Sequence, residues 1–118
     1  MAASVTVRRF GTCIRLRPEK RQEYLQLHRA VWPEVEATLK SANIRNYTIF
    51  DFGEYLFGYY EYVGEDHDRD QARIAAEPVT QRWWQLTDPC QERLPGAPAG
   101  SQWLPLPEVW HLAEDPDD

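Results

Sequence analysis

The chain has few of the features that mark disulfide-rich or membrane-spanning proteins. Its 118 residues include two cysteines, Cys13 and Cys90, and neither belongs to a CxxC pair. Isolated thiols are typical of small core residues in a reducing compartment. No apolar run approaches the roughly 20 residues that span a bilayer, and the first residues lack the charged and apolar order of a secretory signal. We therefore expect a cytoplasmic protein.

Basic charge is also scarce. The 19 acidic and 13 basic residues give a net charge of -6, which is the wrong sign to attract a phosphate backbone or an anionic membrane. Neither nucleic acid nor a membrane is expected as a partner. The three histidines, His28, His67 and His111, are far apart and show no metal-ligand spacing, so no metal site is predicted. His67, among acidic residues, is expected to be a solvated residue at a helix start.

Aromatic residues are plentiful, because they make up 13% of the chain and include five tryptophans. The length and the 42% of hydrophobic residues fit one globular domain with a real core. We expect this single domain to span 1–118, with an ordered core at 5–112 and an acidic tail at 113–118.

Residue patterns predict an alternation of strands and helices. Alternating apolar residues favour strands, and prolines with helix formers mark helix starts. The predicted elements are a strand at 5–17, a helix at 18–41, a hairpin at 43–63, short helices at 65–77 and 78–88, a loop at 93–107 and a last strand, EVWHL, at 108–112.

This order is the α+β plan of a ferredoxin-like split βαβ sandwich, with a four-stranded antiparallel sheet and helices on one face. The other face of such a sheet stays bare, and here the strands are rich in aromatic residues. An exposed apolar face of this kind indicates either dimerisation or a binding cavity.

One titratable ring lies on the apolar side of the first predicted helix. A helical wheel over 24–39 places His28 near the centre of the apolar arc, with Tyr24 one turn earlier. A buried imidazole needs hydrogen-bond partners, so His28 is either a satisfied core residue or part of a polar cavity. Pro33 must interrupt this helix or bend it, which either widens such a cavity or fits the helix to the sheet.

A second group of candidate residues is QRWW at 81–84. Adjacent helical residues point about 100° apart, so Trp83 and Trp84 cannot both face one narrow core stripe. Indole rings suit the C–H face of a sugar, but they equally suit a helix junction and a dimer interface. Asn46 and Tyr47, at the start of the second predicted strand, would add polar groups.

Taken in order, these motifs resemble the L-rhamnose mutarotase family over about residues 8–112. The residues that carry the resemblance are Tyr24, His28, Trp32, Pro33, Glu34, Asn46, Tyr47, Arg82, Trp83 and Trp84. The resemblance implies a homodimeric ferredoxin-like isomerase that interconverts the α and β anomers of L-rhamnose, or a related 6-deoxy sugar, without a cofactor. It also implies a dimer held partly by exchange of the last strand.

Carried over by position, the resemblance makes His28 the proton donor and places Tyr24, Tyr47, Trp83 and Trp84 in the sugar site. Mutarotation needs a proton on the ring oxygen and removal of the anomeric hydroxyl proton. We expect His28 to give the proton to the ring oxygen, while Tyr24 or Tyr47 handles the anomeric hydroxyl. The aromatic hairpin and His111 depart from the family pattern and leave the identity of the sugar open.

Two other functions remain open at this point. One is a dimeric α+β barrel monooxygenase that binds haem or an aromatic substrate, with His28 as the iron ligand. The other is a non-enzymatic module that binds a sugar without changing it. Glycoside hydrolysis is less favoured, because no pair of carboxylates lies on the His28 face of the helix.

Overall fold

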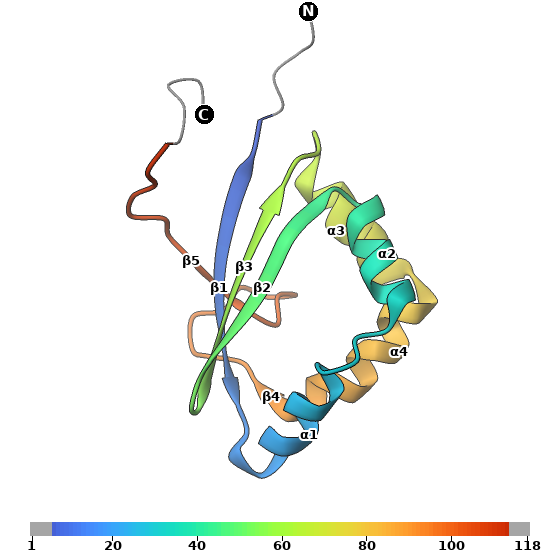
Figure 1. The fold of residues 1–118 in the computed structure, drawn as a ribbon. Coiled ribbons are helices and arrows are strands. Elements are labelled where there is room, and N and C mark those ends of the chain that lie inside the picture. Colours follow the sequence, from blue (N-terminus) through green and yellow to red (C-terminus); the bar gives the residue numbers. More distant parts are fainter. Residues whose placement is uncertain (1–5, 114–118) are drawn as a thin grey trace, which may run out of the picture.

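The computed structural model describes residues 6–113 of the chain. It has a curled antiparallel sheet with the helices along one face (Figure 1), which confirms the predicted ferredoxin-like α+β class. Residues 114–118 of the predicted tail lie outside the described residues. Residue 5, the first residue of the predicted core, also lies outside them.

The sheet is built around the first strand. Its order is β2-β3-β1-β4, and β5 also pairs with β1. The predicted first strand and the hairpin are confirmed, and Gly53, with a φ of 60°, occupies the turn that joins the two hairpin strands, where positive φ favours glycine. The strands are β1 (Arg8–Leu16), β2 (Ile44–Phe52), β3 (Tyr55–Tyr62), β4 (Gln91–Glu92) and β5 (Leu104–Leu106).

Within residues 6–113, four α-helices lie along one face of the sheet, together with two short 3-10 turns. The two short helices predicted after the hairpin are present. No helix in the described part of the chain is long and apolar enough to cross a membrane. The helices are α1 (Arg21–Leu27), α2 (Pro33–Ser41), α3 (His67–Ala76) and α4 (Pro78–Thr87), with 3-10 turns at Pro18–Lys20 and Asp88–Cys90.

The prediction of a single helix at 18–41 is wrong, because the helix is interrupted between Leu27 and Pro33. A proline disfavours helical geometry in the residue before it, and Trp32 is extended, with a ψ of 131°. Pro33 then begins α2, where its missing N–H costs nothing. His28 therefore ends α1 and does not lie in the middle of a longer helix.

The predicted last strand at 108–112 is also wrong. The pairing with β1 occurs earlier, where Leu106 lies opposite Gly11 and Leu104 opposite Cys13. Pro107 follows directly and cannot donate a hydrogen bond to a ladder. Residues 107–113 continue away from the sheet without strand pairing. The two-residue strand β4 was not predicted, because two residues show no periodicity.

In the described part of the chain, two clusters of buried side chains hold α1, α2 and α3 to the sheet. The first core cluster joins α1 to β1 and β3, and the second joins α2 and α3 to β2 and β3. Cys13 and Cys90 are both buried and unpaired, as the sequence predicts. The first core cluster is Ile14, Leu16, Tyr24, Leu56 and Cys90, and the second is Ala42, Ile44, Tyr62 and Ile74.

Candidate active site

A β-bulge in β2 decides the side of the sheet on which Tyr47 lies. Arg45 pairs with Glu61 and Thr48 with Tyr59, so Asn46 and Tyr47 together lie opposite Tyr60. Asn46 has a φ of 53°, which asparagine tolerates better than most residues. One extra residue moves the following side chains to the opposite face. Tyr47 thus joins Tyr60 on the helix-facing side, with ring centroids 5.5 Å apart.

Tyr24 and His28 meet at the end of α1, as their spacing predicts. Their ring centroids are 4.2 Å apart and nearly stacked. His28 Nδ1 lies 2.9 Å from the backbone oxygen of Tyr24. Tyr24 is 2% exposed and belongs to the first core cluster, whereas His28 is half-buried. His28 is therefore held by the core but is not enclosed in it.

The hydrogen bond to Tyr24 determines which nitrogen of His28 carries the proton. A carbonyl oxygen only accepts, so Nδ1 must be the donor and Nε2 carries a lone pair in the neutral ring. Burial lowers the pKa of His28 from 6.5, and the Tyr24 carbonyl opposes this effect. The neutral form is therefore dominant near pH 7, with Nε2 as the nitrogen that is free to exchange a proton.

The two tryptophans of α4 have different surroundings. Trp83 is 6% exposed and Trp84 is 40% exposed, which confirms that both cannot face one core stripe. The Trp83 ring meets His28 and Trp32 edge to face, at centroid distances of 5.5 and 5.1 Å. The structure brings Trp83, but not Trp84, into contact with His28.

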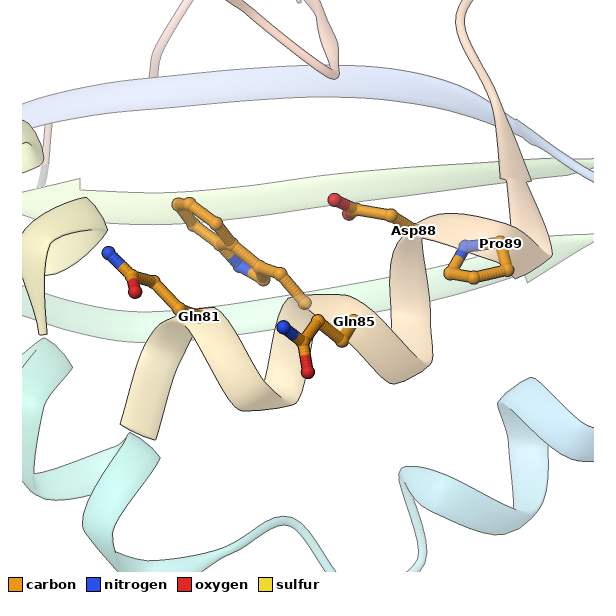
Figure 2. A pocket seen from close by; sticks show the side chains of 5 residues that line it. Gln81, Gln85, Asp88 and Pro89 are labelled. Carbon is orange, nitrogen blue, oxygen red and sulfur yellow. The ribbon is translucent and has the colours of Figure 1, made fainter. Parts of the chain in front are cut away.

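Trp84 lines an open groove along α4. The groove has a volume of about 510 Å³, and Figure 2 shows Gln81, Gln85 and Asp88 along the helix with Pro89 beyond its end. Burial raises the pKa of Asp88 above its ordinary value. An indole ring beside amide and carboxyl groups can bind a polar ring-shaped molecule through both its C–H face and its hydroxyls.

The tyrosines of the site stay protonated at neutral pH. Desolvation raises the pKa of Tyr47 to about 12, although 41% of the residue's surface remains exposed. The pKa of Tyr24 is raised by burial and by the proximity of Tyr47, while a hydrogen bond from Gln91 lowers it. Both hydroxyls are therefore neutral groups that can donate as well as accept hydrogen bonds.

Two residues near this site, Gly58 and Trp103, were not predicted from the sequence. A Cβ atom on Gly58 of β3 would lie 3.4 Å from the Trp103 ring and 2.7 Å from Thr12 Oγ1. Trp103 also packs against the first core cluster. A glycine inside an aromatic strand indicates that another part of the chain or a ligand approaches its backbone closely. Trp103 had no such signal, because it lies in the segment predicted as a loop.

His67 does begin α3, but the expectation that it is solvated is wrong. Its side chain is 16% exposed and stacks on Phe10 at a centroid distance of 4.3 Å. Its Nε2 lies 2.9 Å from the hydroxyl oxygen of Tyr60. The residues next to His67 in sequence are hydrophilic and gave no indication of this burial. The side chains that cover it, Phe10 and Tyr60, come from strands that are distant in the chain.

The fold is of the ferredoxin-like α+β class, and its candidate site places a half-buried histidine beside a tyrosine ring and a buried indole ring. A family model described as L-rhamnose mutarotase matches residues 9–112. The chain belongs to the L-rhamnose mutarotase family, and it is an isomerase of the mutarotase type that acts on a carbohydrate.

Individual relatives agree with this assignment. The L-rhamnose mutarotase of Shigella flexneri serotype 5b is 34% identical over 102 residues, which cover 84% of this chain and 92% of the relative. That of Oceanobacillus iheyensis is 31% identical over 109 residues, covering 90% and 99%. These matches do not favour the monooxygenase or the non-enzymatic module.

Solved structures support the fold. The L-rhamnose mutarotase FA22100 of Formosa agariphila has a TM-score of 0.68 at 24% identity and covers 90% of this chain and 99% of that one. A NIPSNAP family protein of Agrobacterium tumefaciens has a TM-score of 0.58 at 20% identity, covering 78% and 82%. At these identities the likeness concerns the fold alone.

Proposed function

We propose that the protein interconverts the α and β anomers of L-rhamnose, or of a related 6-deoxy sugar, at a site formed by Tyr24, His28, Tyr47, Trp83 and Trp84. The observation that carries this proposal is the fixed His28 ring, whose Nδ1 is bound to the Tyr24 carbonyl and whose Nε2 is left for the substrate. The names of the relatives support L-rhamnose as the sugar.

The proposed reaction moves one proton between two oxygens of the same carbon. Neutral His28 takes the proton of the anomeric hydroxyl at Nε2 and then gives it to the ring oxygen. The bond between the anomeric carbon and the ring oxygen breaks, while the anomeric carbon–oxygen bond becomes double. The aldehyde rotates and closes on its other face by the reverse steps. One nitrogen serves both oxygens because both are bonded to the anomeric carbon.

The tyrosine hydroxyls assist as neutral hydrogen-bond donors. Negative charge develops on the sugar oxygens during ring opening, and a placed hydroxyl stabilises it. Tyr47 is the accessible partner, since it is 41% exposed and Tyr24 only 2%. The Tyr24 side chain instead supports the His28 ring by stacking.

Tyr47→Phe is therefore expected to lower kcat/KM more than Tyr24→Phe does. Loss of one charge-stabilising donor costs on the order of 10²-fold in kcat, whereas Tyr24→Phe keeps the stacked ring and the backbone carbonyl. Anomer exchange rates of both variants check this ordering. Equal losses, or a larger loss for Tyr24→Phe, would make Tyr24 the hydroxyl that touches the sugar.

The rate of exchange should rise with pH and then level off. The folded pKa of His28 lies below 6.5, and below that pKa the ring is protonated, so Nε2 cannot accept a proton. We expect kcat/KM to increase through this pKa and to stay constant above it, when followed between about pH 5 and 8. A rate that falls as pH rises in this range would show that the imidazolium is the active form.

Proton magnetisation transfer between the anomeric signals of L-rhamnose tests the function directly. The wild-type protein is expected to accelerate exchange above the spontaneous rate at the same pH. L-Fucose, L-mannose and D-glucose serve as comparison sugars and define the specificity. No acceleration for any of these sugars would reject the proposed function.

We further propose that the protein acts in the cytoplasm as a homodimer. The face of the sheet opposite the helices exposes Phe50, Phe52 and Phe57 by 60%, 73% and 38%, an apolar surface of the kind that marks an interface. Beyond β5, Val109, Trp110 and Leu112 are 69% to 97% exposed, which favours a second copy of the chain as the partner that covers them.

The proposed location in the cytoplasm is supported by the buried unpaired thiols, which fit a reducing compartment. Catalysis found only in another cell fraction would contradict this location.

Light scattering of the purified chain checks the assembly. We expect twice the 13.9 kDa mass of one chain for the wild type, and dissociation when Phe50 and Phe52 are both replaced by Asp. Leu86→Asp is the matched control, because Leu86 is an exposed apolar residue of α4 on the helix layer. A wild-type protein with the mass of one chain would contradict the homodimer.

A further inference from the structure

A second hydrogen-bonded pair, Tyr60 and His67, lies on the helix-facing side of the sheet and is not used by the reaction proposed above. The Tyr60 hydroxyl is 2.9 Å from His67 Nε2. Phe10 stacks on both rings, at centroid distances of 4.9 Å from Tyr60 and 4.3 Å from His67. The pair is thus held by packing as well as by its hydrogen bond.

Tyr60 adjoins the sugar site through Tyr47. The two rings come from neighbouring strands, with centroids 5.5 Å apart, and the bulge at Asn46 turns Tyr47 toward Tyr60. Tyr47 also lies near enough to Tyr24 and Tyr60 to raise the pKa of both. Tyr24 belongs to the first core cluster and Tyr60 packs against the second. Tyr47 and Tyr60 therefore extend the site from His28 toward the second cluster.

The hydrogen bond to His67 leaves lone pairs of the Tyr60 hydroxyl oxygen available for another donor. The Asp68 carboxylate is 3.5 Å from His67 Nδ1, which favours a proton on that nitrogen and a lone pair on Nε2. Tyr60 then donates to Nε2, and its oxygen keeps lone pairs for another donor. Among residues 6–113 no other hydrogen-bond partner of this hydroxyl is found. A sugar hydroxyl is a donor that fits this position.

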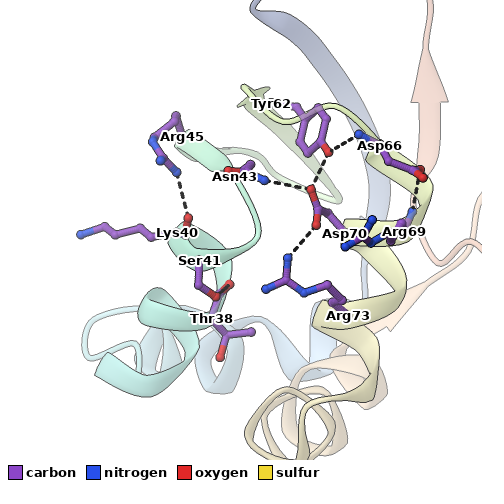
Figure 3. A network of polar contacts seen from close by, with 10 residues as sticks. All are labelled: Thr38, Lys40, Ser41, Asn43, Arg45, Tyr62, Asp66, Arg69, Asp70 and Arg73. Carbon is purple, nitrogen blue, oxygen red and sulfur yellow. Dashed lines mark hydrogen bonds and ion pairs between the residues drawn. The ribbon is translucent and has the colours of Figure 1, made fainter. Parts of the chain in front are cut away.

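The helix that carries His67 is fixed by a buried polar network. Asp70 accepts hydrogen bonds from Tyr62, Asn43 and Arg73, and the Asp66 side chain caps α3 (Figure 3). This network ties α3 to β3 and to the turn before β2. His67 begins α3, so its ring has a fixed place relative to Tyr60, and the network itself does not touch the Tyr60 hydroxyl.

We propose that Tyr60 binds a ring hydroxyl of the sugar away from the anomeric carbon, and that His67 is the positioning residue that orients the Tyr60 hydroxyl. This inference rests on the proposed function, because Tyr47 of that site is the neighbour that brings Tyr60 to the sugar. Tyr60 would thereby help determine which sugar is accepted, since a site built to bind a hydroxyl disfavours a sugar that cannot present one there.

Anomer exchange kinetics of Tyr60→Phe test the proposal. We expect KM for L-rhamnose to rise about tenfold, as for the loss of one hydrogen bond, with a smaller change in kcat, because the anomeric centre is untouched. Preference for L-rhamnose over L-fucose should change in the same variant. His67→Ala should raise KM by a smaller factor, and His67→Asn, which keeps a hydrogen-bonding group, should restore part of it. The double variant should be no worse than Tyr60→Phe alone.

Tyr62→Phe is the matched control. Tyr62 lies on the same face of β3, but its hydroxyl donates to Asp70 in the core, so this change should lower Tm and leave KM unchanged. An unchanged KM in Tyr60→Phe, or equal KM increases in Tyr60→Phe and Tyr62→Phe, would overturn the inference. If the wild type accelerates exchange of no sugar, the proposed function fails and the inference fails with it. If the wild type accelerates anomer exchange and His28→Ala loses this acceleration, an unchanged KM in Tyr60→Phe rejects this inference alone.

Discussion

Replacing His28 by alanine is expected to lower kcat/KM for anomer exchange by about 10²- to 10⁴-fold, the usual contribution of a positioned acid–base group. His28 Nε2 is the proposed proton carrier, and the tyrosine hydroxyls beside it have raised pKa values, so they cannot replace it as a base. Magnetisation transfer between the anomeric signals of L-rhamnose measures the loss. Thermal unfolding should change little, because His28 is only half-buried.

Arg29→Ala is the control for His28→Ala, because it introduces the same residue at the neighbouring position. Arg29 follows His28 directly and is exposed, and within residues 6–113 its side chain hydrogen-bonds to Gln26 alone, on the surface of α1. This variant should exchange anomers as the wild type does. If His28→Ala kept the wild-type rate, His28 would not be the acid–base group, and proton transfer would have to be assigned to another residue.

Replacing Trp83 by alanine should destabilise the protein by about 3–5 kcal/mol, the usual cost of removing a buried aromatic side chain. Trp83 is 6% exposed and supports both His28 and Trp32, so exchange activity should fall as well. Trp84→Ala changes the neighbouring residue, which is 40% exposed. We expect nearly wild-type stability for this variant, with a raised KM because an indole of the sugar site is lost.

Urea unfolding followed by circular dichroism separates these two variants. Protein concentration must be the same in all samples, since the stability of a dimer depends on it. Trp83→Phe keeps a ring at the buried position and should lose less stability than Trp83→Ala. Equal stability of the two alanine variants would contradict the different burial of the two indoles, and an unchanged KM in Trp84→Ala would remove Trp84 from the site.

Local patterns were enough to predict the class of fold and the first contact of the site. The contact between Tyr24 and His28 depends only on their spacing within one helical turn. It persists even though the predicted helix at 18–41 breaks before Pro33. The different surroundings of Trp83 and Trp84 likewise follow from their adjacency. The hairpin follows from two aromatic runs on either side of Gly53.

Long-range contacts could not be predicted in this way. The solvated surroundings expected for His67 were inferred from its sequence neighbours, whereas its actual neighbours are Phe10 and Tyr60. Trp103 packs over Gly58 from a segment that shows no periodicity. The last strand was placed at 108–112 because that segment has apolar residues, but pairing depends on where β1 still offers an edge.

The sequence by itself determined the order of strands and helices, the family resemblance and the residue types available for acid–base chemistry. Only the tertiary structure decided which of them meet. A single extra residue at Asn46 sets the register between β2 and β3 and thereby the face on which Tyr47 lies. Packing against Phe10 of β1 and Tyr60 of β3 buries His67, and Trp83 is buried beside the rings of His28 and Trp32. The physical reason is that spacing within one element acts over a few residues, while register and burial depend on strands and helices that are distant in the chain.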